Sequence, residues 1–395
     1  MGISFGSLEI TDKTKNVIMD CLDSNRVSCG KLVKKFEDMF AEKIGTKYAV
    51  AVGSGTDALT IALMTLYDFG AKRGDEIIIP ALTFIATANA VLEAGFTPVF
   101  IDIDPNTLCI DCKKIEEKIT DKTKAILPVH LMGNPVDMFE VLILADKYKL
   151  FIIEDAAEAY GTSYYGKYAG SIGNMGCFST YVAHAITTIE GGVIITNDER
   201  LAELCRSLRS HGRVCVCSPC LYNTGGGDCK KRFNSGTDIR FEFDRVGVSS
   251  KMNEIEAAIG IGGLEKYEEI LYEKTRIRNL FVERFKQLGN LIKIYYSNNK
   301  DVVIGTHAFP IVFKKQGVRD IVLKALNDNS IDARTLFKCI PTQISGYEFL
   351  GYKMGQFPIS EYIGDNGLHF GLLSGITTEE VNKIHEIVTN SIGGV

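Results

Sequence analysis

Four cysteines lie close together in this chain of 395 residues. They are Cys215, Cys217, Cys220 and Cys229, which gives the spacing C-x-C-x₂-C-x₈-C within 15 residues. Thiolates at such spacing are suitable ligands for an iron–sulfur cluster or for a structural zinc ion. Free surface thiols are the structural alternative, although four in so short a stretch disfavour it. The spacing therefore predicts a metal or cluster site.

A second chemical feature is the turn Ser54-Gly55-Thr56, which follows an apolar run and precedes an amphipathic stretch. Backbone N–H groups at the start of a helix can bind a phosphate, because the helix dipole adds positive potential there. Ser179 offers a hydroxyl that would reach the same phosphate if both project into one cavity. Many α/β proteins have such a turn without a ligand, so the turn alone is a weak signal.

Two further side chains are suited to a flat, charged ring. Asp155 follows the apolar run Leu150-Phe-Ile-Ile-Glu154, which predicts a position at the carboxyl edge of a sheet, where ligands of open α/β sheets bind. A carboxylate there can pair with a protonated pyridine nitrogen and make that ring an electron sink. Phe84 can present an aromatic face to such a ring. A turn-capping role for Asp155 and a core role for Phe84 are the structural alternatives.

The elements that would position these residues follow an alternating pattern. Short β-branched runs alternate with amphipathic stretches, which predicts an α/β fold with a mostly parallel sheet covered by helices. The predicted strands span residues 48–52, 76–79, 98–101, 125–129, 150–154, 176–179 and 192–196, and the predicted helices span 57–67, 85–94, 135–148 and 199–210.

The length of the chain is sufficient for two domains. We predict a large cofactor-binding domain over residues 1–248 and a smaller C-terminal α/β domain over residues 249–395. Residues 211–245 hold the four clustered cysteines but little periodicity, and a loop that long in a compact protein is more often functional than idle. The elements predicted for the smaller domain are helices at 253–260 and 264–288, strands near 292 and 307, a helix at 318–327 and a final helix from 378.

The composition excludes some classes of protein. A formal charge of -5 and 46% hydrophobic residues describe an ordinary globular chain, without the excess of basic residues typical of nucleic-acid binding. The sequence has no signal-peptide pattern, and no apolar run reaches the roughly 18 residues of a membrane helix. We therefore expect a cytoplasmic protein, in which eleven cysteines indicate thiols or metal ligands rather than a disulfide framework.

The order of these residues resembles that of the DegT/DnrJ/StrS sugar aminotransferases along nearly the whole chain. The resemblance implies an α/β fold of the fold-type I class of pyridoxal-phosphate (PLP) enzymes, and a homodimer with shared active sites. It also implies that Gly55, Thr56 and Ser179 hold the cofactor phosphate, that Phe84 stacks on the pyridine ring, and that Asp155 binds the ring nitrogen. The motifs that carry the resemblance are Ser54-Gly55-Thr56, Thr83-Phe84-Ile85-Ala86-Thr87, Glu154-Asp155-Ala156-Ala157 and the segment 176–198.

His184 stands at the position of the family's cofactor lysine. A lysine amine forms a Schiff base with the cofactor, whereas an imidazole cannot hold it covalently but can move protons near neutral pH. Histidine-bearing members of the family are nucleotide-sugar 3-dehydratases. The resemblance therefore implies dehydration at C3 of a nucleotide-linked 4-keto-6-deoxyhexose, on the way to the 3,6-dideoxysugars of lipopolysaccharide O-antigens, with pyridoxamine 5′-phosphate (PMP) as cofactor and His184 as base.

Two other functions compete with this dehydratase. A lone histidine in an apolar stretch is more often structural than catalytic, so a silent ligand-binding relative that has lost its lysine is one alternative. Ordinary transamination is the least expected function, because the lysines nearest to position 184 in the sequence, Lys167 and Lys230, lie in other segments.

Three further positions take their roles from the resemblance. Ser249 stands where an asparagine of the other subunit usually reaches the phosphate, and Glu158 stands where the family has a residue near the cofactor's 3-hydroxyl. Arg334 is a candidate cation of the substrate pocket, and a solvated arginine is the alternative.

The cysteine stretch resembles a loop of the iron–sulfur 3-dehydratases, whose [2Fe–2S] cluster receives electrons from a flavin reductase. Those enzymes take one cluster ligand from the position that is Ala157 here. We therefore predict that Cys220 replaces that ligand and that Cys215, Cys217, Cys220 and Cys229 hold the cluster within one loop. Zinc, no metal, or a cluster-free dehydratase that regenerates PMP from glutamate are the alternatives. The nucleotide and the sugar epimer are not specified by the sequence.

Overall fold

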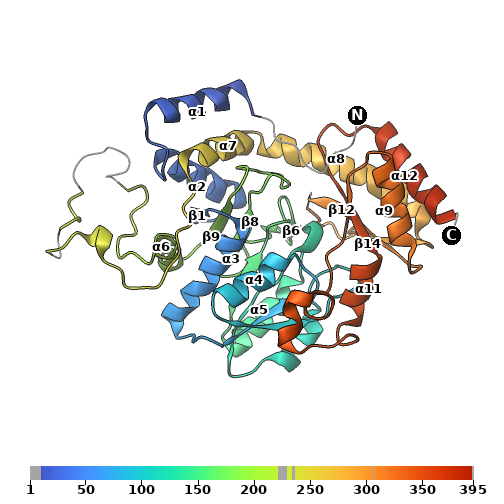
Figure 1. The fold of residues 1–395 in the computed structure, drawn as a ribbon, viewed down its shortest axis with the longest axis horizontal. Helices are drawn as coiled ribbons and strands as arrows, with labels where there is room; N and C mark the ends of the chain where they lie inside the picture. The colour runs from blue at the N-terminus through green and yellow to red at the C-terminus, as the bar shows by residue number, and fades with distance from the viewer. Residues whose placement is uncertain (1–9, 221–228, 234–235, 306, 394–395) are drawn as a thin grey trace.

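A seven-stranded sheet forms the centre of the first part of the chain (Figure 1). The computed structural model describes residues 10–220, 229–233, 236–305 and 307–393. In spatial order the strands are β1 (Tyr48–Val52), β9 (Gly192–Thr196), β8 (Met175–Ser179), β5 (Phe151–Asp155), β4 (Thr123–Ile126), β2 (Glu76–Pro80) and β3 (Thr97–Ile101). β9 pairs antiparallel with both neighbours and the other neighbouring strands pair parallel, which confirms the predicted mostly parallel sheet.

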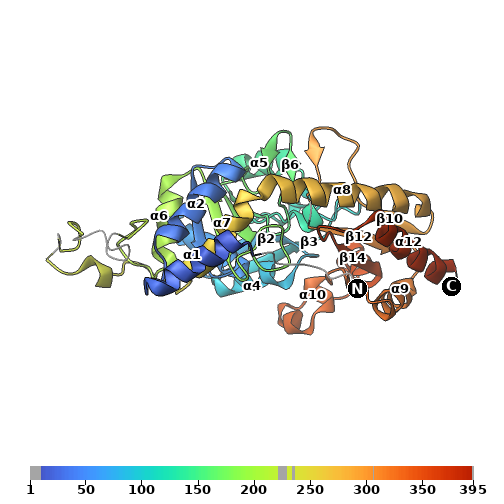
Figure 2. The same ribbon diagram turned by 90° about the horizontal axis from the view of Figure 1, so that it is seen from above.

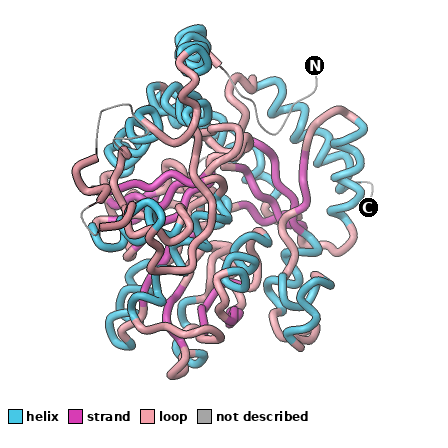
Figure 3. Tube along the Cα trace, turned by 60° about the vertical axis from the view of Figure 1, so that its left-hand side comes forward, coloured by secondary structure: helices cyan, strands magenta, loops and turns pink. Residues whose placement is uncertain are grey.

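Side chains of β1 alternate between two apolar clusters, one on each face of this sheet. Val50 and Val52 pack in one cluster, and Ala49 and Ala51 pack in another with Phe36. Because successive side chains of a strand point to opposite faces, both faces need a covering layer, and Figure 3 shows strands enclosed by helices. The first face is covered by α3 (Gly55–Met64), α4 (Ile85–Glu93) and α6 (Glu199–Leu208), and the second by α2 (Lys31–Ile44), α5 (Met138–Tyr148) and α7 (Glu254–Glu265).

A four-stranded antiparallel sheet forms the centre of the second part of the chain. The long helix α8 (Tyr267–Phe285) runs toward it from the end of α7 (Figure 2). The predicted strands near residues 292 and 307 and the predicted helices at 318–327 and from 378 are all present. The strand order is β10 (Ile292–Ile294), β12 (Ala308–Phe313), β14 (Gly367–Gly371), β13 (Ala333–Thr335), and the helices of this part include α9 (Val318–Asp328), α11 (Pro358–Asn366) and α12 (Thr378–Gly393).

The two parts of the chain share buried contacts. Val312 and Leu336 from the second part pack in the same apolar cluster as Ile77 and Ile153 of the large sheet. A small sheet also links the parts, because β11 (Val302–Val303) pairs with β6 (Ser163–Tyr164), which pairs with β7 (Lys167–Tyr168). The predicted domain boundary after residue 248 stays a prediction.

The described parts of the cysteine-rich loop, 211–245, project beyond α6, away from the sheets (Figure 1). The regular element within them is a single 3₁₀ turn, Ile239–Phe241. Among the described residues, no helix combines the length and the apolar character required to cross a lipid bilayer.

Candidate active site

The start of helix α3 and the end of strand β8 meet at the predicted phosphate turn. β1 leads into α3, whose N-cap Ser54 accepts a hydrogen bond from the backbone N–H of Asp57 at 3.0 Å. A Cβ atom added at Gly55 would lie 2.7 Å from Cβ of Ser179, the last residue of β8, so the absence of a side chain permits this close approach. The structure thus brings Gly55, at the helix N-terminus, next to the Ser179 hydroxyl, as a phosphate site requires.

Asp155 lies at the end of β5 and is 6% exposed. Its carboxylate accepts hydrogen bonds from Oγ1 of Thr87 at 2.8 Å and from the backbone N–H of Ala157 at 3.2 Å. Thr87 is itself held by Thr83, at 2.9 Å between their hydroxyl oxygens. Burial raises the pKa of Asp155, although Thr87 and the Ala157 N–H oppose this shift. A cationic N–H group beside this carboxylate would favour its charged form.

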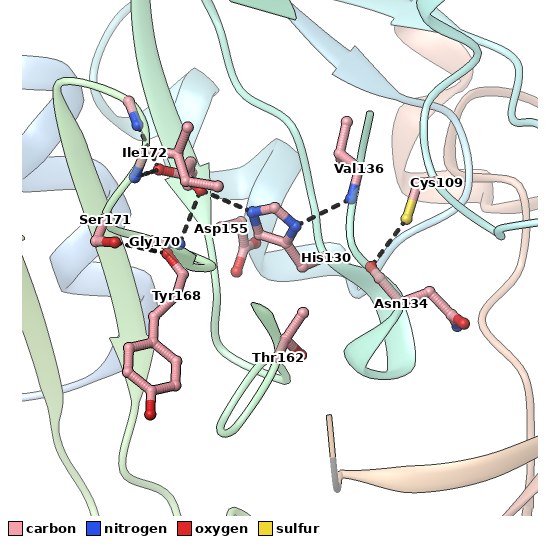
Figure 4. A network of polar contacts seen from close by, with 12 residues as sticks. Cys109, His130, Asn134, Val136, Asp155, Thr162, Tyr168, Gly170, Ser171 and Ile172 are labelled. Atoms are coloured by element: carbon pink, nitrogen blue, oxygen red, sulfur yellow. Dashed lines mark hydrogen bonds and ion pairs between the residues drawn. The ribbon is translucent and has the colours of Figure 1, made fainter. Parts of the chain in front are cut away.

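His130 and Glu154 form a buried pair next to Asp155. Figure 4 shows His130 beside Asp155. Nδ1 of His130 accepts the backbone N–H of Val136 at 3.1 Å, so the proton of a neutral ring lies on Nε2, which donates to Glu154 at 2.9 Å. Glu154 also accepts three backbone N–H groups, from Gly170, Ile172 and Gly173. The backbone N–H of His130 donates to the carbonyl oxygen of Asp155 at 3.0 Å. This network fixes the strand end on which Asp155 lies.

Phe84 is the N-cap of α4, and 55% of its surface is exposed. Its ring makes a tilted contact with Phe337, with 5.5 Å between ring centroids. A core role would require burial, so the exposure of Phe84 agrees with a face that is available to a ligand ring.

His184 lies in the loop between β8 and β9. Its Nδ1 atom is buried and has no hydrogen-bond partner among the described residues. The ring lies 5.0 Å from the ring of His307 and 6.5 Å from that of Tyr160, measured between centroids. Burial, with a smaller contribution from Lys274, lowers the pKa of His184 to about 4. The imidazole is therefore neutral at pH 7 and can accept a proton.

Glu158 and His307 extend this group of titratable side chains. Oε2 of Glu158 accepts the backbone N–H of Met132 at 2.7 Å, and Oε1 lies 3.4 Å from Nε2 of His307. Burial raises the pKa of Glu158 to about 8, and Asp155 adds to the shift. The structure therefore forms a buried series Glu158–His307–His184. The sequence predicts only a strand near His307, and no local pattern marks the place of this histidine in the site.

A pocket of about 180 Å³ adjoins His184 and is also lined by Lys274 of α8. The amine of Lys274 donates to the carbonyl oxygen of Leu372 at 2.6 Å, and burial lowers its pKa to about 8. A lysine therefore neighbours His184 in space, although none does so in the sequence. Local spacing could not reveal this contact, because it joins two distant segments.

Ser249 and Arg334 lie on the surface of the chain. Ser249 is exposed and forms a bridge with Ser210, whereas the adjacent Ser250 reaches the phosphate turn. The Ser250 hydroxyl accepts the N–H of Gly53 at 2.9 Å and donates to Asp57 at 2.8 Å. The predicted contact of Ser249 across a subunit interface stays a prediction.

Arg334 lies on β13, 3.4 Å from Asp332 and directly opposite His369. Burial lowers the pKa of His369 and of His307. The positive charge of Arg334 adds to both shifts. Arg334 thus lies on the His307 side of the site, and its role toward a substrate stays a prediction.

The clustered cysteines do not assemble the predicted metal site in this structure. Cys215, Cys217 and Cys220 line one pocket of about 170 Å³, but the fourth thiol of that pocket is Cys29 and not Cys229. All are free thiols. No three or more His, Cys, Asp or Glu side chains are arranged to hold a metal ion anywhere in the described ranges. The described thiols therefore give the predicted cluster or zinc ion no support.

The chain is similar to known proteins over nearly its whole length. Residues 8–389 match the model of the DegT/DnrJ/EryC1/StrS aminotransferase family. The GDP-perosamine synthase of Escherichia coli O157:H7 is 34% identical over 380 residues, which cover 96% of this chain and 95% of that protein. The GDP-4-keto-6-deoxy-D-mannose 3-dehydratase of Yersinia pseudotuberculosis is 31% identical over 391 residues, which cover 95% of each.

The solved structures extend this similarity to the fold. A histidine-to-asparagine variant of GDP-4-keto-6-deoxymannose-3-dehydratase with bound GDP-perosamine superposes with a TM-score of 0.85 at 29% identity, covering 98% of this chain and 100% of that one. The similar proteins thus include sugar-modifying enzymes with aminotransferase and with dehydratase names, which leaves the reaction open. The chain belongs to the DegT/DnrJ/EryC1/StrS aminotransferase family and has the fold-type I architecture predicted from its sequence.

Proposed function

We propose that this protein is a PMP-dependent 3-dehydratase of a nucleotide-linked 4-keto-6-deoxyhexose. The observation that carries the proposal is the imidazole of His184, a neutral base with a buried, unpaired Nδ1 in the described part of the chain, at the position of the family's lysine. The similarity to the Yersinia pseudotuberculosis 3-dehydratase supports the reaction class and a nucleotide-sugar substrate.

The residues at the sheet edge fit the cofactor. Gly55, Thr56 and Ser179 would hold its phosphate, Phe84 would cover the ring, and Asp155 would pair with the ring nitrogen. When bound, PMP supplies an amine that condenses with the 4-keto group and a ring that takes up electrons. The solved 3-dehydratase of E. coli with bound hydrated PLP, 28% identical, supports a cofactor of this class.

His184 has a defined task in this proposal. Its neutral ring would accept the proton released at C4′ when PMP is bound, and the cofactor would supply the electron relay that lets the C3 hydroxyl of the sugar leave. The protonated ring can then donate to the departing hydroxyl. His307 borders His184 and lies 3.4 Å from Glu158, so these two side chains hold the ring and exclude water from one side of it.

The supply of electrons or of an amine after dehydration is a separate question. The predicted [2Fe–2S] cluster with an external reductase requires iron and acid-labile sulfide in anaerobically purified protein. The described thiols give that prediction no support, so no step of the proposal passes through a cluster. Turnover that needs glutamate and no reductase would favour the cluster-free route. The homodimer stays a prediction as well.

Transamination is a second candidate function, which one observation favours. Lys274 lines the same pocket as His184, and its lowered pKa of about 8 leaves a useful fraction of the amine unprotonated at neutral pH. The 34% identity to a GDP-perosamine synthase is consistent with it. An amine in that pocket would replace the missing lysine.

Product analysis separates the two functions. We would incubate the PMP-loaded protein with GDP-4-keto-6-deoxymannose, with and without glutamate, and identify the sugar by mass spectrometry. Loss of water from the sugar, abolished by His184→Asn and retained by Lys274→Met, is the expected result. An amino sugar formed by wild type and His184→Asn but not by Lys274→Met would overturn the proposal. His385→Asn, at a histidine of α12 that packs on Phe285, is the matched control.

A further inference from the structure

The pocket lined by Cys29, Cys215, Cys217 and Cys220 is also strongly cationic. It shares no lining residue with the pocket at His184. Its wall contains no carboxylate among the described residues. The basic residues that line it are Arg206, Arg209, Arg213, Arg240 and Lys251.

Two of these arginines already have anionic partners. Arg209 lies 2.6 Å from Glu37 and also donates to the carbonyl oxygen of Ala51, and Arg240 lies 2.6 Å from Asp238. Glu37 is already engaged by neighbouring groups, because it also accepts the N–H of Ala51 and the hydroxyl of Ser218. The positive charge on the rest of the wall is therefore not balanced by these carboxylates.

Arg206 and Arg213 present buried donors without acceptors. The Nε atom of each is buried and has no hydrogen-bond partner within the described ranges. The guanidinium of Arg206 lies over the ring of Tyr48, 5.9 Å from its centroid, which orients the group but does not satisfy its N–H. These Nε atoms have no access to the pocket, so an anion in it would contact the other nitrogens of the two guanidinium groups and offset the repulsion between their charges.

The geometry favours a tetrahedral oxyanion. Arg206 comes from α6, Arg213 from the loop after it and Lys251 from the segment before α7, so donors approach the cavity from separate elements. Forked guanidinium groups match the oxygens of phosphate. The N-terminus of α2 does not contribute, because the N–H of Gly30, which also lines the pocket, donates to Glu254 at 2.9 Å.

We infer that this pocket binds a phosphate-bearing anion through Arg206, Arg213 and Lys251. The inference does not depend on the proposed dehydration. The anion has two possible sources, the diphosphate of a nucleotide or free phosphate. The thiols of Cys29, Cys215 and Cys217 border the same cavity, so an occupied pocket would also cover them.

Isothermal titration calorimetry tests the inference. Inorganic phosphate, pyrophosphate and GDP are titrated into PMP-saturated protein, in which the turn at Gly55 is already filled. We expect Arg206→Ala/Arg213→Ala to weaken binding about tenfold or more, as loss of hydrogen bonds to a charged group predicts. Arg200→Ala, on α6 but outside the pocket, is the control and should bind as wild type does. Ser179→Ala should also leave this binding unchanged, which separates it from the cofactor site.

Comparison of the ligands identifies the source of the anion. Tight GDP binding that competes with pyrophosphate assigns the pocket to a nucleotide diphosphate, whereas phosphate binding without GDP binding assigns it to free phosphate. Absence of binding for all three ligands, or equal affinity in wild type and the double alanine variant, overturns the inference. If the alanine variant fails to fold, Arg206→Lys/Arg213→Lys keeps the charge but lacks the forks and should weaken pyrophosphate binding.

Discussion

His184 has three properties that a lysine at the same position would not combine. It cannot tether the cofactor covalently, it is neutral at pH 7 because burial depresses its pKa to about 4, and its Nδ1 has no acceptor or donor among the described residues. A buried polar atom without a partner is costly unless a ligand supplies one. The residue is therefore suited to proton transfer with a bound molecule rather than to a structural role.

Glu158 should make stability depend on pH. Its folded-state pKa of about 8 lies above the ordinary value of 4.5, so the folded chain holds the carboxyl proton more tightly than the unfolded chain. Relative to Glu158→Gln, we expect the free energy of unfolding of wild type to be highest below pH 4.5 and to fall as the pH rises to about 8. Urea denaturation of both proteins at pH 5 and pH 8.5 measures this difference. The same difference at both values would contradict the assigned shift.

Thr87 should act as a positioning residue for Asp155. Thr87→Val keeps the side-chain shape but removes the hydroxyl that donates to the carboxylate at 2.8 Å. We expect PMP affinity to fall about tenfold, because a hydrogen bond to a charged group is lost. Thr83→Val, which removes only the hydroxyl beyond Thr87, should have a smaller effect. Unchanged affinity in Thr87→Val, measured by fluorescence titration of PMP, would remove Thr87 from the site.

At the scale of elements, the close contact between α3 and β8 would form the proposed phosphate site. Gly55→Ala would put a Cβ atom 2.7 Å from that of Ser179, and the helix start or the strand end must then shift. We expect PMP affinity to fall about tenfold or more, since overpacking of this kind costs about 1–3 kcal/mol. Gly346→Ala, where an added Cβ meets nothing within 4 Å, is the control. Wild-type affinity in Gly55→Ala would exclude this turn as the phosphate site.

Strands and helices of the sheet were predictable because their signals are local. The run before Asp155 is continuously apolar, as a strand buried on both faces must be, and it became β5 with Asp155 at its end. His307, His130 and Lys274 could not be predicted, because their contacts join distant segments and no periodicity marks them. The spacing of the cysteines likewise could not predict that Cys29 lines the same pocket as Cys215, because the two residues are distant in the sequence.

At the scale of the whole molecule, two sheets with a shared core form a fold that supports more than one reaction. Similarity over nearly the entire chain extends to a perosamine synthase and to a 3-dehydratase, so the family alone does not select between them. In the proposed function, the selection depends on the side chain at position 184 and on the amine of Lys274, which lines the same pocket. The central claim is therefore the assignment of His184 as the base.

Exchange of the C4′ hydrogen of PMP with solvent deuterium tests that claim most directly. The PMP-loaded protein is incubated with a 4-keto-6-deoxy nucleotide sugar in D₂O, and the cofactor is extracted and analysed by mass spectrometry. We predict exchange in wild type and a loss of roughly 10²-fold or more in His184→Asn, with PMP binding retained. Exchange at the wild-type rate in His184→Asn would contradict the account.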